Sequence, residues 1–412
     1  MIGVRITGGS SLGVEIYRKS LEAIRVIGEH IHRTPVDKST TFSKMFGGEV
    51  FLKYENLQKS GSFKARGALY KISKLASKGF REVVAASSGN HAQGVAYASS
   101  IYGVEATIFM PETASIAKIE ATKGYGARVI LRGRFFDEAY QEALRYSEER
   151  GAPLIHAFND IDIIAGQGTI ALELMEQLVS FDLVLVPVGG GGLISGIASV
   201  LKELGSRARV IGIEPEAAPK FRESMMAGRI VDVEVRPSIA DGLLAKKPGD
   251  LTFELVRRYV DDIVTVSEES IARAVYMLMQ RNKVVAEGAG AVGIAAMLEG
   301  KIDVRGKRCV VIVSGGNVDL ADLYRIIMKG LTAEGRMIEL SIELPDAPGE
   351  LKRVLEVIYE YRGNIVEIIH RRGGIDIPPG WAAVDLIIEV PTREASESIT
   401  RRLTEKGYRI YS

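Results

Sequence analysis

The stretch LVLVPVGGGGLISG, residues 183–196, decides how the chain folds. Its first six residues are apolar on both faces, as in a buried strand of a parallel sheet. Four glycines follow, which cost conformational entropy and supply no side chains to a core. Between a strand and a predicted helix, they leave backbone N–H groups free to bind a phosphate group. The residues concerned are Gly189, Gly190, Gly191 and Gly192.

The glycine run does not identify the phosphate by itself. The third glycine of G-x-G-x-x-G would fall on Ser195 or Ile194, and no G-K-[ST] follows. However, Glu214 ends the next predicted strand, 22 positions after Gly192, where a ribose-binding acid would stand. A nicotinamide-dependent dehydrogenase therefore remains an alternative at this point.

Residues 13–330 alternate short apolar, β-branched runs with helix-length amphipathic stretches. This alternation predicts an α/β fold with parallel sheets covered by helices. Ligands on such sheets bind at the carboxyl ends of strands. The predicted strands are EVFLKY, EVVAASS, EATIFM, ARVILR, LVLVPV, RVIGIE, DIVTV and RCVVIVS.

Two of these strands end in small polar residues that could bind a ligand. RCVVIVS ends at Ser314, whose hydroxyl can meet a ligand as a neutral partner. EVVAAS leads into a predicted helix N-terminus that suits a carboxylate, although serine is also an ordinary N-cap. The residues of this second turn are Ser88, Gly89, Asn90 and His91.

The stretch KSGSFKARGA, residues 59–68, carries three cations after the strand EVFLKY. Lys64 stands where a helix is predicted to begin, and a cation there opposes the helix dipole. A lysine held as a neutral imine suffers less from that field, which is the chemistry of a Schiff base. Lys64 is thus the candidate for covalent catalysis, and Lys59 and Arg66 are assigned to the loop and helix surface.

Composition narrows the class of protein further. The 412 residues predict two or three domains, and the net charge of +1 gives no field that would attract nucleic acid or an anionic membrane. No apolar run is long enough for a transmembrane helix, and the first 13 residues do not resemble a signal peptide. The single cysteine, Cys309, cannot form an internal disulfide, so we expect a cytoplasmic protein.

The pattern changes near residue 333. Residues 337–412 read as strand, helix, strand, strand, helix, strand, a ferredoxin-like βαββαβ unit. We therefore predict a first domain over residues 1–332, a linker at 333–336 and a small second domain over 337–412.

Six stretches, in family order, resemble the serine/threonine dehydratases of pyridoxal-phosphate (PLP) fold type II. The resemblance covers about residues 20–330 and implies a tryptophan-synthase-β-like fold with two parallel-sheet subdomains. The smaller subdomain, roughly 52–149, would be inserted in the larger. Residues 337–412 resemble an ACT domain through the loop PDAPGEL. The six stretches are SFKARGA (62–68), SSGNHAQG (87–94), AGQGT (165–169), PVGGGGLISG (187–196), EGAG (287–290) and SGGN (314–317).

The resemblance implies roles for individual residues. Lys64 would carry PLP as an imine and act as the base, with Ser88 as a second catalytic residue. Phe63 would pack on the pyridine ring, and Ser314 would meet its nitrogen. The remaining cofactor residues would be Asn90, Gly189, Gly190, Gly191, Gly192, Leu193, Gly242 and Glu287. The substrate carboxylate would be held by Ser88, Gly89, Asn90 and His91.

The implied reaction is β-elimination by a carbon–nitrogen lyase, a threonine dehydratase or ammonia-lyase. It would convert L-threonine to 2-oxobutanoate and ammonia, and L-serine to pyruvate. A serine racemase of the same family is the alternative, and the nicotinamide-dependent dehydrogenase is the distant one. Isoleucine biosynthesis is the expected setting, although a catabolic duty stays open.

Two positions depart from the patterns of relatives. Some relatives bind a divalent cation next to an acid that matches Glu214, but the second acidic position is Lys220 here. We therefore expect no metal, with Glu214 as the candidate ligand if one binds, and Lys220 as the group that could replace the cation. Ala65 stands where threonine synthases have Asp, which argues against that reaction.

The ACT resemblance implies an amino-acid effector bound between two copies of the domain. Isoleucine and valine are the leading candidates, and a module that only oligomerises is the alternative. The turn from Asp346 to Gly349 offers N–H groups for a carboxylate, and Asn364 begins the adjacent strand. We expect a homodimer or homotetramer.

Overall fold

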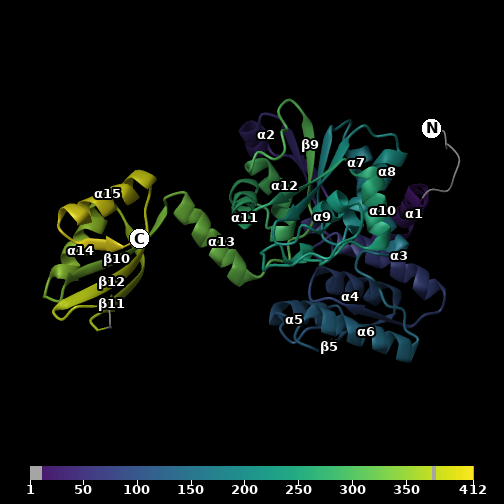
Figure 1. Ribbon diagram of the computed structural model, residues 1–412, viewed down its shortest axis with the longest axis horizontal. Coiled ribbons are helices and arrows are strands. Elements are labelled where there is room, and N and C mark those ends of the chain that lie inside the picture. Colours follow the sequence, from purple (N-terminus) through teal and green to yellow (C-terminus); the bar gives the residue numbers. More distant parts are fainter. Residues whose placement is uncertain (1–11, 374–376, 412) are drawn as a thin grey trace. The chain divides into compact units, whose positions relative to one another are not determined.

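The computed structural model describes residues 12–373 and 377–411, drawn as ribbon in Figure 1. Residues 1–11, on which the prediction about a signal peptide rests, lie outside this part. The chain divides into two compact units, residues 1–319 and 320–412. Helix α13 (Leu320–Ala333) groups with the second unit, so the division comes earlier than the predicted boundary near residue 333.

The large sheet of the first unit has six strands in the order β1-β2-β9-β6-β7-β8. β1 runs antiparallel to β2, and the other neighbours are parallel. All five residues of β6 (Leu183–Pro187) are buried, because β9 and β7 flank the strand and helices cover it. The other strands are β1 (Val36–Lys38), β2 (Glu49–Tyr54), β7 (Arg209–Pro215), β8 (Asp262–Val266) and β9 (Arg308–Val313).

A second parallel sheet forms the smaller subdomain, with β3 (Glu82–Ala86), β4 (Glu105–Met110) and β5 (Arg128–Leu131). The two sheets confirm the predicted α/β class. β2 pairs with β9, so residues 52–54 belong to the large sheet, whereas the sequence had placed them in the smaller subdomain.

Helices cover both faces of the large sheet, with α7, α8 and α10 on one side and α11 and α12 on the other (Figure 1). α7 and α8 approach closely, since a Cβ on Gly196 would lie 2.4 Å from the carbonyl oxygen of Ile164. None of the described helices is long and apolar enough to span a bilayer. The helices of the first unit are α1 (Leu12–Ile27), α2 (Thr40–Phe46), α3 (Lys64–Ser77), α4 (Asn90–Tyr102), α5 (Ile116–Gly124), α6 (Phe136–Arg150), α7 (Ile161–Gln177), α8 (Gly192–Glu203), α9 (Lys220–Ala227), α10 (Asp250–Tyr259), α11 (Glu268–Asn282) and α12 (Gly288–Leu298).

The second unit is a four-stranded antiparallel sheet in the order β11-β12-β10-β13. Its element order after α13 confirms the predicted βαββαβ pattern. The apolar faces of its two remaining helices pack with the sheet in a core that includes Ile342, Val357 and Ile399. The elements are β10 (Met337–Pro345), α14 (Glu350–Glu360), β11 (Asn364–Arg371), β12 (Trp381–Glu389), α15 (Arg393–Glu405) and β13 (Arg409–Tyr411).

Candidate active site

A cavity of about 900 Å³ in the first unit is lined by the turns that follow β3, β6 and β9, by the start of α3, and by the short helix η3 (Asp241–Leu243). The structure brings every cofactor and substrate residue proposed from the sequence to this cavity. They are Phe63, Lys64, Ser88, Gly89, Asn90, His91, Gly189, Gly190, Gly191, Gly192, Leu193, Gly242, Glu287 and Ser314.

Lys64 is the first residue of α3, as predicted, and Phe63 is the N-cap. The Lys64 Nζ donates to the carbonyl oxygen of Ala157 at 2.8 Å and lies 5.2 Å from the centre of the Phe63 ring. Burial lowers the pKa of this amine to about 8, although the charge of Glu287 opposes the shift. An amine with such a pKa can both accept and return a proton near neutral pH.

The backbone around Lys64 is held by close helix contacts. A Cβ on Gly94 of α4 would lie 3.0 Å from the carbonyl carbon of Lys64. On α7, a Cβ on Gly166 would lie 2.5 Å from the Cα of Gly67. Glycines in the SSGNHAQG and AGQGT stretches therefore let two helices pack directly against the first turn of α3.

The tetraglycine turn joins β6 to α8. Gly191 has a φ of 93°, and a Cβ on Gly190 would lie 2.2 Å from the ring of Phe158. In the part of the chain that the structure describes, the N–H groups of Gly190, Gly191 and Gly192 have no protein acceptor, whereas Ser195 donates to the Gly191 carbonyl at 3.0 Å. Free donors at the N-terminus of α8 form an anion site.

Asn90, Glu287 and Asn317 form a polar cluster on the cavity wall. Asn90 Nδ2 donates to Glu287 Oε1, and Asn317 Nδ2 donates to Asn90 Oδ1, both at 2.7 Å. Burial, together with the charge of Asp241, raises the pKa of Glu287 to about 7. Asn317 was not proposed as a site residue from the sequence, and its place in the stretch SGGN was the available signal.

The two histidines of the cavity are neutral structural residues. His91 Nε2 bonds to the carbonyl oxygen of Ile155 at 2.9 Å, and burial with the nearby charge of Lys64 lowers its pKa to about 3. His156 Nδ1 accepts the N–H of Phe158 at 3.2 Å, and burial also lowers the pKa of this histidine. Both imidazoles are therefore neutral at neutral pH, and each bonds to a backbone group. No sequence signal had pointed to Phe158.

Ser314 follows β9 and lies beside the start of α3. Its carbonyl oxygen accepts the N–H of Phe63 at 3.1 Å, and a β-bridge joins Ser62 to Gly315. The strand end after β9 is thereby attached to the residues that lead into Lys64.

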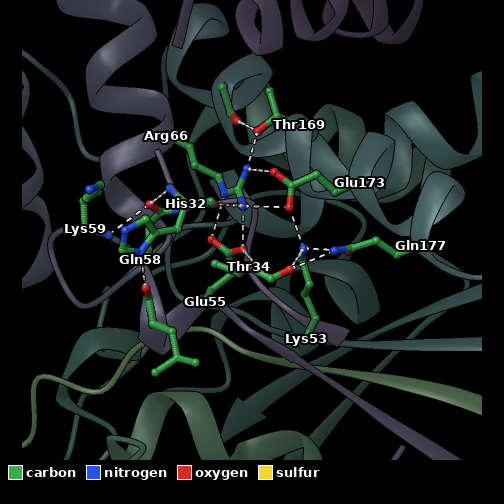
Figure 2. A network of polar contacts seen from close by, with 12 residues as sticks. His32, Thr34, Lys53, Glu55, Gln58, Lys59, Arg66, Thr169, Glu173 and Gln177 are labelled. Carbon is green, nitrogen blue, oxygen red and sulfur yellow. Dashed lines mark hydrogen bonds and ion pairs between the residues drawn. The ribbon is translucent and has the colours of Figure 1, made fainter. Parts of the chain in front are cut away.

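The sequence assignment of Arg66 to the helix surface is wrong. Its side chain is 0% exposed and forms ion pairs with Glu55 and Glu173, as Figure 2 shows. No local pattern signals this burial, because the partners lie on other elements. Lys59 is exposed, as expected.

Lys220 occupies the position next to Glu214 where a cation was considered. Its Nζ lies 3.0 Å from Glu214 Oε1, and both side chains are fully buried. The ammonium also donates to the carbonyls of Val188 at 3.0 Å and Ala218 at 3.1 Å. Glu214 thus has a partner inside the protein and does not line the cavity, which removes the ribose-binding acid of a dehydrogenase.

The proposed effector residues lie in two places within one copy of the second unit. Gly349, with a φ of 94°, is the N-cap of α14, and Asp346 pairs with Arg372 at 3.1 Å just before it. Asn364 pairs with Glu389 at the other end of the sheet, because α14 returns the chain along β10.

Comparison with known proteins identifies the class. The family model described as pyridoxal-phosphate-dependent enzyme matches residues 27–315. The chain belongs to this family of PLP-dependent enzymes, and its fold is that of PLP fold type II. Together with the similar proteins named next, this match confirms the predicted resemblance to the threonine dehydratases.

Similar proteins show which members of the PLP-dependent family this chain resembles. The L-threonine ammonia-lyase of Thermotoga maritima is 49% identical over 390 residues, which are 94% of this chain and 97% of that protein. The solved threonine deaminase of T.th. has a TM-score of 0.70 and 43% identity, over 73% of this chain and 98% of that one. The solved structure of maize serine racemase has a TM-score of 0.72 and 40% identity, and the match covers 77% of this chain and 98% of that chain.

The cavity residues fit PLP. The Lys64 amine is available for an imine because the polar partner of its Nζ is a backbone carbonyl. The unpaired N–H groups of the tetraglycine turn suit the cofactor phosphate. Phe63 offers a ring face, and Ser314 offers a neutral hydroxyl, on the walls of the same cavity.

Proposed function

We propose that the chain catalyses the PLP-dependent conversion of L-threonine to 2-oxobutanoate and ammonia, and of L-serine to pyruvate and ammonia. The observation that carries this proposal is the convergence of Lys64, Asn90, the tetraglycine turn and Ser314 on one cavity. The high identity to an L-threonine ammonia-lyase over nearly the whole chain supports the choice of threonine.

Each group of residues in the cavity has a separate role in the proposed reaction. PLP, when bound, withdraws electrons from the Cα of an attached amino acid. Lys64 takes the Cα proton, since its lowered pKa leaves a large neutral fraction near pH 8. Ser88 and Gly89, in the turn before α4, orient the substrate carboxylate. The N–H groups of the tetraglycine turn hold the cofactor phosphate in place.

Ser314 would meet the ring nitrogen of bound PLP with a neutral hydroxyl. A hydroxyl does not protonate that nitrogen as a carboxylic acid would, so the cofactor would be a weaker electron sink, and elimination of the Cβ hydroxyl would be favoured. The elimination releases one water, and the later hydrolysis takes one water up as ammonia leaves.

One experiment tests this function. The purified protein with PLP is given L-threonine and L-serine, and release of 2-oxo acids is measured beside the absorbance of the lysine–PLP imine. We expect 2-oxobutanoate from threonine and loss of both signals in Lys64→Ala. An imine without any release of 2-oxo acid would contradict the proposed lyase activity, although the chain would still be a PLP-dependent protein.

Serine racemisation is a second candidate. Ser88 lines the same cavity as Lys64, so two groups that can carry a proton face one substrate. Chiral analysis of recovered serine tests it, with D-serine expected only if Ser88 returns a proton to Cα. Ser88→Ala should then abolish D-serine, while 2-oxo acid release falls only as far as the loss of one contact to the substrate carboxylate requires.

We further propose that residues 337–412 act as an ACT domain that binds isoleucine or valine between two copies. Asp346 and Asn364 lie at opposite ends of the sheet, so a site that uses both needs a second copy. This supports a homodimer or homotetramer. Titration of activity with both amino acids, in the wild type and in Asn364→Ala, tests the proposal, and an unchanged response in the variant contradicts the assignment of Asn364.

The proposed location is the cytoplasm. Cys309 is fully buried, and burial raises the pKa of its thiol, so it stays an unreactive thiol and no disulfide is needed for the fold.

A further inference from the structure

A buried network of four charges lies beside the first turn of the helix that carries Lys64 (Figure 2). Its cations are Lys53 on β2 and Arg66 on α3, and both side chains are 0% exposed. Its anions are Glu55, directly after β2, and Glu173 on α7. Two positive and two negative charges leave the network neutral.

Arg66 is the centre of this network. Its Nε and Nη2 donate to the two oxygens of Glu55 at 2.8 and 2.7 Å. Its Nη1 and Nη2 donate to the two oxygens of Glu173 at 2.6 and 3.0 Å. The guanidinium therefore makes two bidentate contacts, which fix its plane as well as its position. Glu55 and Glu173 hold the pKa of Arg66 above its usual value against the effect of burial.

The remaining polar groups around the network are also satisfied. Lys53 Nζ lies 2.5 Å from Glu173 Oε2 and donates to the carbonyl of Thr34 at 2.8 Å. The Thr34 hydroxyl donates to Glu55 at 2.5 Å, and Thr169 accepts from Arg66 at 3.2 Å. A network this complete has one geometry, since any shift of α3 breaks several charge-assisted bonds together.

The network joins the two ends of the segment that contains Lys64. Glu55 and Arg66 are 11 positions apart and bracket the loop that contains Phe63. On an α-helix, positions two apart point to nearly opposite sides, so Arg66 points away from the cavity that Lys64 lines. The guanidinium thus holds the helix from behind, while the glycine contacts of α4 and α7 hold its backbone.

Stability alone does not explain these charges. Buried ion pairs can often be replaced by apolar side chains without loss of stability, because removing charges from water offsets their attraction. What apolar side chains cannot supply is a directional contact from β2 and α7 to a single residue of α3.

We propose that Arg66, with Glu55, Glu173 and Lys53, is a positioning network that sets the Lys64 amine at the correct distance from the tetraglycine turn. Arg66 touches neither substrate nor cofactor and acts through Lys64. This inference rests on the proposed role of Lys64 as the PLP lysine and base. Displacing a reacting group by about 1 Å can lower a rate by roughly a hundredfold.

The test uses Arg66→Lys, which keeps the charge but loses the fork geometry. The rate of imine formation with PLP is measured by absorbance, kcat and KM for threonine are measured separately, and the midpoint of thermal unfolding is recorded. We expect imine formation and kcat to fall by about tenfold or more, with KM changed by less than about twofold. Glu173→Gln, which leaves the Glu55 contact in place, is the milder second variant should Arg66→Lys fail to fold.

Ile72→Ala is the matched control, because Ile72 is 0% exposed on the same helix and has no part in the network. It should lower the unfolding midpoint but leave imine formation and kcat nearly unchanged. Equal losses in the network variants and in this control would overturn the proposal. Absence of an imine in the wild type would instead overturn the role of Lys64.

Discussion

The cavity and the neighbouring charge network differ in whether their buried charged groups form ion pairs. In the cavity, Lys64 and Glu287 lose water without an ion-pair partner among the described residues, and burial moves their pKa values to about 8 and about 7. In the network of Figure 2, Lys53 and Arg66 are equally buried but each meets a carboxylate. Burial without pairing makes groups that titrate near neutral pH, whereas pairing fixes the position of a buried group. The carboxylates hold the pKa of Arg66 above its usual value, while burial still lowers the pKa of Lys53.

The largest expected effect concerns Lys64, the buried amine that has no ion-pair partner among the described residues. Lys64→Ala removes the amine that binds PLP and moves the Cα proton, so 2-oxo acid release should fall by about a thousandfold or more. Steady-state kinetics with threonine measures this loss. Activity within tenfold of the wild type would show that another group is the base.

A third buried lysine, Lys220, tests what pairing contributes to a buried charge. Lys220→Ala leaves the carboxylate of Glu214 buried without its cation and opens space where the ammonium was, which should lower the free energy of unfolding by about 3–5 kcal/mol. Urea denaturation measures the change. Ammonium ions should restore part of the stability by entering between Glu214 and the carbonyls of Val188 and Ala218, while tetramethylammonium, which is too large, serves as the control.

The pH dependence of the apoprotein tests the unpaired carboxyl. In the folded chain Glu287 keeps its proton up to a pKa of about 7, whereas in the unfolded chain it loses the proton near the ordinary pKa of 4.5. The folded state binds more protons between these values, so this contribution favours folding below pH 4.5 and is lost as the pH rises towards 7. Glu287→Gln should remove a pH-dependent contribution to the free energy of unfolding on the order of 3 kcal/mol. Identical pH profiles of unfolding in variant and wild type would contradict the assignment.

The smallest expected effect concerns an exposed pair. Lys246 and Asp137 form an ion pair at the cavity mouth, and each side chain is 60% exposed. Because water screens such pairs, Lys246→Ala should barely change the free energy of unfolding. Added salt should remove even that difference. A larger, salt-resistant loss would show that the pair closes the cavity mouth more tightly than its exposure suggests.

Much of the fold and site could be predicted from local sequence. The apolar run 183–188 with its glycines already predicted β6, its turn and the start of α8. The same holds for Lys64 at the start of α3 and Ser314 after β9. Because parallel strands end at one edge of a sheet, these local features predicted a shared site.

Other features depended on contacts between distant residues. Arg66 meets Glu173 across 107 positions, and no periodicity of either helix signals that pairing. Asn317 and Phe158 reach the cavity only because the turns of separate strands meet there. The separation of Asn364 from Asp346 follows from the strand register, which the pattern of apolar residues leaves open.

By itself, the sequence determined where chemistry could occur, because strand ends, glycine turns and helix starts are local events that a few residues specify. Only the tertiary structure decided which charges are paired. Pairing depends on side chains that come together from separate elements, and the free energy of a buried charge depends on that meeting. Thus Lys64 and Arg66, two positions apart in one stretch, are respectively an amine that contacts a backbone carbonyl in a cavity and the paired centre of a network.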